Sequence, residues 1–426
     1  MLRRYRRDLA LLSPAARRYL LGSCMMGAAH AVPWALLALY LDLLGRTKQE
    51  IGFLQSCDSW GKVAVALPAA FLLARRRAAP LFVRAALVAG AGYMALPWLG
   101  SQAAMGACAF VSGLALAVHY VAIAPFLFRH TSPEERASVF GLAEAVRTMA
   151  SVAGAFGAGR FVDWMTPVFE SERIALGAAI SLAGVACLFG AFFYARIEES
   201  EPSMAPDQRL LPILLENKGL LARFAIPQFV IAVGAGFCIP FLSLYFKERF
   251  SLAPGSWGSL FAAGQVLMTT GFLLTPWVLA RMGFVRSIVF IEFASIPFFL
   301  VLAYSQSVAF ATVAFLLRGA LMNSTHPIHK NFMMQATPAG AREIQIGIQA
   351  TLWGVGWVVG PLAAGHVLDA TGNDYTILML TTAGVYVVAG CLSWILLSPV
   401  ETRMKREQLE AQASAVNAEV QPSGAV

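Results

Sequence analysis

Three basic side chains lie near the middle of long apolar segments of this chain, namely Lys62, Arg147 and Arg318. A charge at the centre of a membrane helix costs about 2.5–3.5 kcal/mol even on a mild insertion scale, so such residues face a water-filled cavity or a partner. The guanidinium fork of arginine suits two oxygens of a carboxylate or phosphate, and lysine adds a point charge. These residues therefore predict a binding site for an anionic substrate.

Two acidic residues accompany these cations at helical spacing. Asp58 precedes Lys62 by four positions and Glu144 precedes Arg147 by three, so each pair shares a helix face and can form an ion pair. The pairs either neutralise each other and hold the bundle, or line a cavity where substrate competes for the cation and a proton for the acid. We favour the second interpretation, with Glu144 as proton-coupling group and Asp58 and His119 as further candidates. His119 also fits a packing role.

Weaker candidates for the substrate site lie on two later segments. Trp353 and Gln349 occupy positions that match Arg147 and Ala143 in an internal repeat described below, so Trp353 is expected to face the same site as Arg147. Asn323 is a polar candidate on the segment that carries Arg318. An aromatic ring beside the cations suggests a substrate with an acid group and an apolar or ring portion.

The elements that position these residues are membrane helices. The chain is 58% hydrophobic and only 13% charged, below the charged fraction of soluble domains. A bilayer core about 30 Å thick needs about 20 apolar residues per helix, and lipid leaves free backbone groups no other partner. Twelve such runs are expected, at 18–42, 51–74, 81–100, 103–127, 138–161, 174–195, 222–246, 257–280, 285–305, 307–328, 343–367 and 376–397.

The basic residues predict the topology. With the N-terminus inside, 23 of the 32 Lys and Arg residues fall on the cytoplasmic face, six on the other face and three within spans. The expected organisation is a cytoplasmic tail (1–17), a six-helix bundle (18–195), a cytoplasmic linker (196–221), a second six-helix bundle (222–397) and a cytoplasmic tail (398–426). The net charge of +8 is explained by anionic lipid headgroups, without nucleic acid.

An internal repeat relates the two bundles. Residues 141–163 and 347–369 share six of 23 positions, Gly141 with Gly347, Val152 with Val358, Gly154 with Gly360, Ala158 with Ala364, Gly159 with Gly365 and Asp163 with Asp369. The repeat extends to Leu39-Tyr40 with Leu244-Tyr245, Gly52 with Gly258 and other pairs. Two similar halves can rock about a midplane site and expose it to either side in turn.

These features resemble the major facilitator superfamily of secondary transporters. The resemblance rests on HTSPEER (130–136) and its second copy TPAGAR (337–342), each before a glycine-rich span. It implies an all-α membrane fold of twelve helices in two pseudo-symmetric six-helix bundles. The family's acid between spans 2 and 3 is replaced by Ala74, and its counterpart in the second half by Ala280. The usual cytoplasmic charge latch is therefore not expected.

A second family motif, rich in glycine, matches span 11 better than span 5. When this motif lies on span 5, the family resemblance links it to drug and proton antiporters. On span 11 we interpret it as a packing motif, because small residues every four positions let helices approach closely. A proline in the same span frees a backbone carbonyl and can bend the helix. The expected packing residues are Gly154, Gly159, Gly356, Gly360, Pro361 and Gly365.

Several function classes are excluded by what the sequence lacks. No nucleophile elbow, zinc-protease motif or phosphate-binding loop is present, so no enzyme is expected. The six cysteines lie inside spans without CxxC spacing, and His326 and His329 have no further ligand nearby, so neither a metal site nor a cofactor is expected.

The sequence therefore predicts a proton-coupled transporter of a small organic anion that works by alternating access. It is expected as a monomer in the cytoplasmic (inner) membrane of a bacterium, with both termini cytoplasmic and with substrate, protons and lipid as its partners. Two alternatives stay open: a proton-driven multidrug efflux pump, and a non-transporting membrane sensor or scaffold with the same fold.

Overall fold

The computed structural model describes residues 13–74, 77–131, 133–199, 210–338 and 341–420. Residues 1–12, 200–209 and 421–426 of the expected tails and linker lie outside the described residues. Within the described ranges the chain forms helices and no β-strand, which confirms the all-α prediction. The helices are α2 (Pro14–Leu43), α3 (Lys48–Ala74), α4 (Ala78–Ala95), α5 (Gln102–Arg129), α6 (Pro133–Phe169), α7 (Glu172–Tyr194), α8 (Leu210–Cys238), α9 (Leu242–Phe250), α10 (Pro254–Met282), α11 (Phe284–Tyr304), α12 (Val308–Ala336), α13 (Arg342–Ala370) and α14 (Tyr375–Val420).

Ten of the described helical segments are long and apolar enough to cross a membrane, and the bent α10 makes an eleventh. Helix α3 is 27 residues long, which also suffices for a bilayer core. The seventh expected span is interrupted: α8 and α9 are joined by a short 3-10 turn, Ile239–Phe241. Pro240 lies in this turn and lacks the N–H that would continue the helical bonding. Helix α8 begins at Leu210, within the expected linker, and α14 continues to Val420, within the expected second tail.

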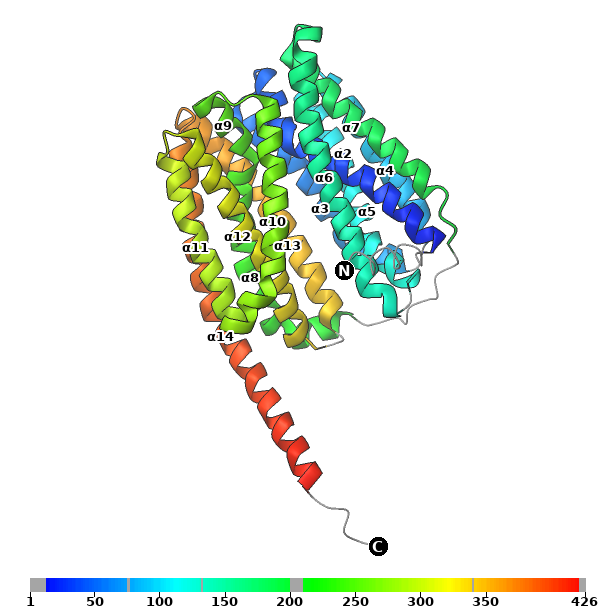
Figure 1. Ribbon diagram of the computed structural model, residues 1–426, viewed down its shortest axis with the longest axis vertical. Helices are drawn as coiled ribbons and strands as arrows, with labels where there is room; N and C mark the ends of the chain where they lie inside the picture. Colours follow the sequence, from blue (N-terminus) through cyan, green and yellow to red (C-terminus); the bar gives the residue numbers. More distant parts are fainter. Residues whose placement is uncertain (1–12, 75–76, 132, 200–209, 339–340, 421–426) are drawn as a thin grey trace.

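The helices form two bundles (Figure 1). Helices α2 to α7 make the first, here called the N-half, with α2 packed on α6 and α7 and α3 packed on α5. Helices α8 to α14 make the second, the C-half, with α13 packed on α8 and α11 on α14. The halves meet mainly where α3 crosses α13 and α6 crosses α10, and α2 adds smaller contacts with α9 and α10.

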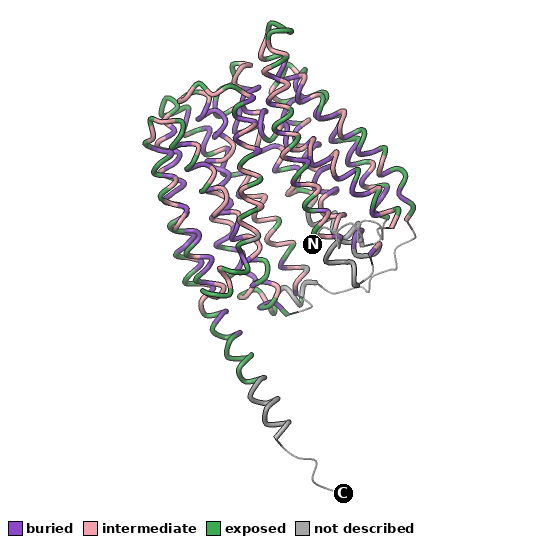
Figure 2. The backbone as a smooth tube through the Cα atoms, viewed as in Figure 1, coloured by how far each residue is buried: buried purple, intermediate pink, exposed green. Residues whose placement is uncertain are grey.

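The outer surface of the bundles is apolar. Figure 2 shows exposed positions along the outward sides of the helices and buried positions between them. Among the exposed side chains are Phe189, Phe192, Phe290 and Ile395. Contiguous exposed apolar surface of this kind is expected where helices face lipid. The part of α14 from Glu401 to Glu410, in contrast, is charged and extends away from the bundle (Figures 1 and 2).

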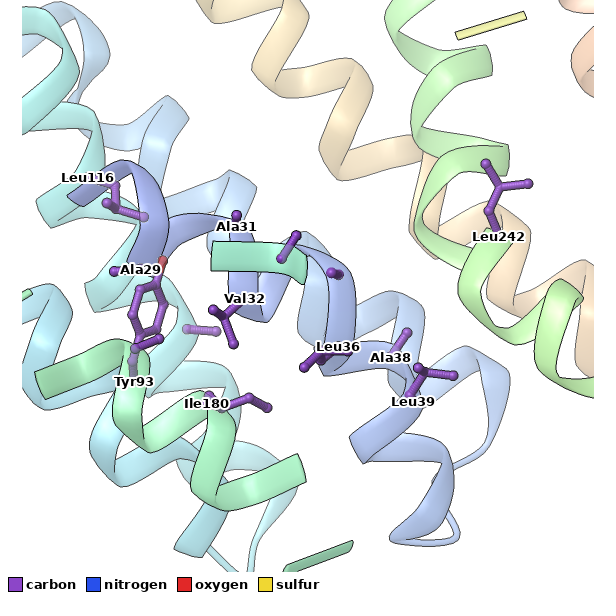
Figure 3. Packing of buried hydrophobic residues seen from close by; sticks show 14 of the residues in the cluster. Ala29, Ala31, Val32, Leu36, Ala38, Leu39, Tyr93, Leu116, Ile180 and Leu242 are labelled. Carbon is purple, nitrogen blue, oxygen red and sulfur yellow. The ribbon is translucent and has the colours of Figure 1, made fainter. Parts of the chain in front are cut away.

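Helix α2 contributes much of the interior of the N-half. Figure 3 shows Val32 and Leu36 of α2 beside side chains of neighbouring helices, among them Tyr93 of α4 and Ile180 of α7. Leu36 is fully buried and Val32 is 5% exposed. Alanine and glycine occupy many of the remaining inward positions of α2, which lets the helices pack closely around it.

The sequence repeat corresponds to repeated contacts. The Tyr40 hydroxyl donates to the Pro97 carbonyl oxygen in the N-half, and the Tyr245 hydroxyl donates to the Leu302 carbonyl oxygen in the C-half at 2.6 Å. In both halves the acceptor follows the donor by 57 residues. Equivalent positions of the repeat therefore make equivalent hydrogen bonds.

The two halves are tied together at one end of the bundle, which we call the latched end (residues 42–50, 159–163, 247–258 and 361–369; top of Figure 1). The carboxylate of Asp369 accepts the backbone N–H groups of Lys48 and Gln49 from α3, each at 2.9 Å. Asp163 accepts the backbone N–H of Gly255 from α10, also at 2.9 Å. The repeated acids thus cap the first turn of a helix in the opposite half.

Close backbone approach accompanies these caps. A Cβ added at Gly159 would lie 2.9 Å from the Pro254 carbonyl oxygen, and one at Gly365 would lie 2.8 Å from the Gln49 Cα. Both glycines therefore leave room for a helix of the other half. Gly52 and Gly258, a second repeated pair, likewise meet the carbonyl oxygens of the helices that cross them.

A cluster of ion pairs completes the latched end. The Lys48 ammonium is bound to Asp42 at 2.7 Å and to Glu248 of the other half at 2.5 Å. The Lys247 ammonium reaches back to Asp42 at 2.8 Å. Lys48 is only 5% exposed. Two of these three contacts join the halves.

The opposite end, where α7 ends and α8 begins, is called the linker end. Acids cap helix N-termini here too, but within one half: Glu199 accepts the N–H of Ala79 at 2.8 Å, and Glu401 accepts those of Phe284 and Val285 at 3.1 Å each. No hydrogen bond or ion pair joins the two halves at this end among the side chains that the structure describes. Within the described ranges, the carboxylate caps and ion pairs between the halves thus lie at the latched end.

Candidate functional site

A cavity of about 360 Å³ lies between the halves. Helices of both halves line it: α2, α3 and α6 from the N-half, and α8, α10, α12 and α13 from the C-half are among them. Its charged lining residues, within the described part of the chain, are Asp58, Arg147 and Arg318. The cavity is a candidate substrate site, because small-molecule sites are concave and mostly apolar with a few polar groups that fix orientation.

Arg318 comes from α12 and is 4% exposed. Its guanidinium lies 5.2 Å from the centre of the Phe299 ring, and its buried Nε has no hydrogen-bond partner. No acid lies within ion-pair distance of it among the described residues. Gly319, Met322 and Asn323 of α12 also line the cavity. Met322 follows Arg318 by four residues and so lies on the same side of the helix.

Arg147 comes from α6 and is already paired. Its Nε donates to Glu144 at 3.1 Å, and its Nη2 donates to the other oxygen of the same carboxylate. The Glu144 side chain is 60% exposed and does not line the cavity. The spacing of three positions predicted this ion pair, and the structure contains it.

Asp58 and Lys62 of α3 form the second expected pair, with 2.5 Å between the Lys62 ammonium and a carboxylate oxygen. Asp58 lines the cavity but Lys62 does not. The expectation that Lys62 faces the substrate is therefore not met: its flexible stem follows the helix back to Asp58 one turn away. The pair presents its acid, and not its cation, to the cavity.

Two further candidates from the sequence lie away from the cavity. Gln349 lies one turn before Trp353 on α13, nearer the linker end, and is not among the lining residues. His119 is 2% exposed and packs against the rings of Phe82, Tyr120 and Tyr194 at centroid distances of 5.2 to 5.5 Å. His119 therefore lies on the inward face of α5, packed among aromatic rings of the N-half.

Aromatic side chains form most of the apolar lining. Trp353 lies 5.0 Å from the His326 ring in an edge-on arrangement, and Trp34 of the N-half lies 5.0 Å from Trp357 of the C-half. All four line the cavity. Trp34 and Trp357 therefore make the aromatic lining continuous across the boundary between the halves.

Other lining residues were not singled out from the sequence, including His30, Tyr93, Trp257 and Phe261. His30 Nδ1 lies 3.2 Å from the Tyr93 hydroxyl. The indole N–H of Trp257 donates to the Ala35 carbonyl oxygen of the opposite half at 2.9 Å. Aromatic residues occur throughout the spans, so their type alone gave no signal that these positions face the cavity.

The glycine and proline positions lie at helix crossings around the site. Gly154 meets the α2 backbone at Ala28, and Gly356 and Gly360 meet α8 at Ala232 and Gly236. Pro361 lies inside α13, and its carbonyl oxygen faces Gly52 of α3. Together with the glycines at the latched end, these residues let α6 and α13 approach their neighbours closely.

No group of three or more His, Cys, Asp or Glu side chains that could hold a metal ion occurs in the described ranges. His326 and His329 of α12 instead pack against the rings of Trp353 and Phe224, respectively.

Comparisons with known proteins agree with this architecture. The family model described as Major Facilitator Superfamily matches residues 19–361 and 224–422. A bacterial homologue of the human lysosomal transporter Spinster, in an inward-facing and occupied conformation, is similar with a TM-score of 0.74 at 11% identity, covering 91% of this chain and 97% of that one. The nucleoside transporter NupG is similar with a TM-score of 0.73 at 14% identity, covering 90% and 99%. Among curated protein sequences, none matches.

Proposed function

The chain belongs to the major facilitator superfamily, and on that premise we propose that it moves a small organic anion across the cytoplasmic membrane by alternating access, coupled to protons. The observation that carries the anion assignment is Arg318. It is a nearly fully buried cation that lines the cavity between the halves and has no acidic partner among the described residues. Leaving such a charge unpaired is costly, and an anionic ligand removes that cost.

The linker end is assigned to the cytoplasm. The excess of basic residues in the loops on that side supports this orientation. With the halves fastened at the latched end, the cavity then opens toward the cytoplasm. The other conformation of the transport cycle requires the Asp163 and Asp369 caps to release and the linker end to close.

Glu144 is assigned as the proton-coupling group. Its carboxylate is bound by Arg147, which lines the cavity, and is itself 60% exposed, so water can reach it. A proton on Glu144 weakens its hold on the guanidinium and so leaves positive charge at the cavity that binds the anion. Proton and anion binding are thereby linked through one ion pair.

Transport is tested with purified protein in proteoliposomes. A thermal-shift screen against carboxylates, phosphates and cationic drugs first identifies ligands, since a ligand that binds the folded state stabilises it. The ligand found is then used for uptake driven by a pH gradient and for counterflow. Anion uptake is expected to respond to the gradient; stabilisation by cationic drugs alone, or the absence of any flux, contradicts the proposal.

The coupling role of Glu144 is tested with Glu144→Gln. This substitution keeps the shape of the side chain but cannot take up or release a proton. Uptake driven by the pH gradient is expected to be lost while counterflow, which needs no net proton movement, persists. Equal pH-driven uptake in the variant and the parent protein contradicts the assignment.

A proton-driven efflux pump for amphipathic cations is the second candidate. Asp58 lines the cavity beside a lining rich in tryptophan, a combination that could hold an aromatic cation. Lys62 already neutralises this acid at 2.5 Å, which makes the candidate weaker. In the thermal-shift screen, stabilisation by cations that is lost in Asp58→Asn would favour it.

A further inference from the structure

We propose that the ligand carries a single negative charge and a flat ring, as an aromatic monocarboxylate does, with its acid group at Arg318 and its ring against the tryptophans that line the cavity. This inference rests on the proposed transport of organic anions and narrows it. It is drawn from the charges that remain uncompensated in the cavity and from the position of the aromatic lining.

The charge balance of the cavity leaves one positive charge. Arg147 is held by both oxygens of Glu144, and Asp58 is held by Lys62. Each pair sums to zero, so within the described part of the chain Arg318 is the one uncompensated charge that lines the cavity. A monoanion makes the occupied cavity neutral. A second negative charge would need to displace Glu144 from Arg147 or stay unpaired in an apolar lining, which is costly.

Arg318 is positioned to receive a carboxylate. The Phe299 ring lies 5.2 Å from its guanidinium carbon, and the buried Nε has no partner. Glu292 of α11 is an acid that is only 1% exposed. It accepts a hydrogen bond from Ser393 at 3.3 Å and does not pair with Arg318. The guanidinium therefore has donors left for two carboxylate oxygens.

The aromatic lining belongs to the same cavity as this cation. Trp353 and His326, whose ring centres are 5.0 Å apart, come from α13 and α12, and His326 is two turns along α12 from Arg318. Trp34 and Trp357 add two more rings across the boundary between the halves. Flat rings prefer offset or edge-on contacts at such spacings. An acid bound at Arg318 thus places an attached ring among side chains that suit it.

The experiment measures binding to the full-length protein by isothermal titration calorimetry. The probes are 2-naphthoate, its uncharged amide 2-naphthamide, the non-aromatic cyclohexanecarboxylate and the dianion phthalate. We expect 2-naphthoate to bind at least about tenfold more tightly than each of the others. The amide loses the charged hydrogen bonds, cyclohexanecarboxylate loses the aromatic contacts, and phthalate adds an unpaired charge.

The variant Arg318→Gln assigns the preference to this residue. The ratio of 2-naphthoate to 2-naphthamide affinity is expected to fall from at least about tenfold to near one, while 2-naphthamide binding persists and shows that the site is folded. Arg318→Lys is expected to keep part of the preference, since it keeps the charge. The matched control Arg403→Gln, on the exposed extension of α14, is expected to leave the ratio unchanged.

The outcomes separate the inference from the proposed function. If phthalate or a phosphate binds as tightly as 2-naphthoate, or if the acid preference survives in Arg318→Gln, the inference is wrong and anion transport stands. If cyclohexanecarboxylate matches 2-naphthoate, the ring assignment is wrong. If no anion of any class binds while cationic drugs do, both proposals are wrong.

Discussion

Carboxylates cap helix N-termini at both ends of this protein, but they connect different parts. At the latched end Asp163 and Asp369 reach helices of the opposite half, whereas at the linker end Glu199 and Glu401 cap helices of their own half. The first two caps exist only while the halves are together at that end. The last two persist whichever end is open. The same interaction therefore contributes to the conformational balance at one end and to the stability of a single bundle at the other.

The loops at the linker end fit this comparison. Ala74 and Ala280 stand where the family resemblance expects an acid, so neither position supplies a carboxylate to join the halves when that end closes. The caps and ion pairs of the latched end have no such counterpart there among the described residues. This difference favours the conformation in which the latched end is closed.

The largest test of the comparison removes Lys48. Lys48→Gln removes the cation that joins Asp42 to Glu248 of the opposite half and leaves Asp42 with Lys247 alone. Breaking a largely buried ion pair costs about 3 kcal/mol. Hydrogen exchange at the first turns of α3 and α10 is expected to accelerate roughly 100-fold. Lys48→Arg serves as the control that keeps the charge. Unchanged exchange would show that these ion pairs do not hold the halves together.

The double variant Asp163→Asn, Asp369→Asn tests the two bridging caps. Loss of one cap costs about 0.5–2 kcal/mol, so the pair is expected to favour opening of the latched end by about 2 kcal/mol. Hydrogen exchange at Lys48, Gln49 and Gly255 reports it directly, because these amides donate to the two acids. Faster exchange confined to one of the two sites would mean that the caps do not act together.

Gly365→Ala sharpens the comparison by steric means. The new Cβ would lie 2.8 Å from the Gln49 Cα of the other half, and overpacking of this kind costs about 1–3 kcal/mol. We expect a lower melting temperature and faster exchange at the first turn of α3. Gly384→Ala in α14 is the matched control, since nothing lies within 4 Å of its Cβ. Equal behaviour of both variants would contradict the close approach at Gly365.

The smallest effect is expected from Glu401→Gln at the linker end. It weakens a cap within the C-half by about 1 kcal/mol, so exchange should accelerate at Phe284 and Val285 and nowhere at the latched end. A change in exchange at Lys48 or Gln49 would show that the two ends are coupled through the bundle, contrary to the comparison.

Local patterns in the sequence predicted local structure well. The length of apolar runs gave the helices, and spacings of three and four residues gave the Glu144–Arg147 and Asp58–Lys62 pairs, because both depend on residues close in sequence. The position of Arg318 near the middle of its span was also predictable from the sequence. The side of the helix on which a residue lies was not, and Lys62 and Gln349 were assigned to a cavity that they do not line.

Contacts between the halves could not be read from the sequence. The repeat identified Asp163 and Asp369 as equivalent, but their partners Gly255 and Lys48 lie 92 and 321 residues away in the chain. Such pairings depend on how the bundles dock, and no local periodicity encodes that. The lining likewise combines Trp34 of the N-half with Trp257 and Trp357 of the C-half, an arrangement that depends on the same docking.

The hydrogen bond from Trp257 to the Ala35 carbonyl oxygen gives the protein a built-in optical reporter. The indole is 4% exposed and belongs to one half, while its acceptor belongs to the other. When the latched end opens, this bond breaks and water reaches the ring, which shifts tryptophan emission to longer wavelength. The protein thus signals its own conformational cycle without an attached dye.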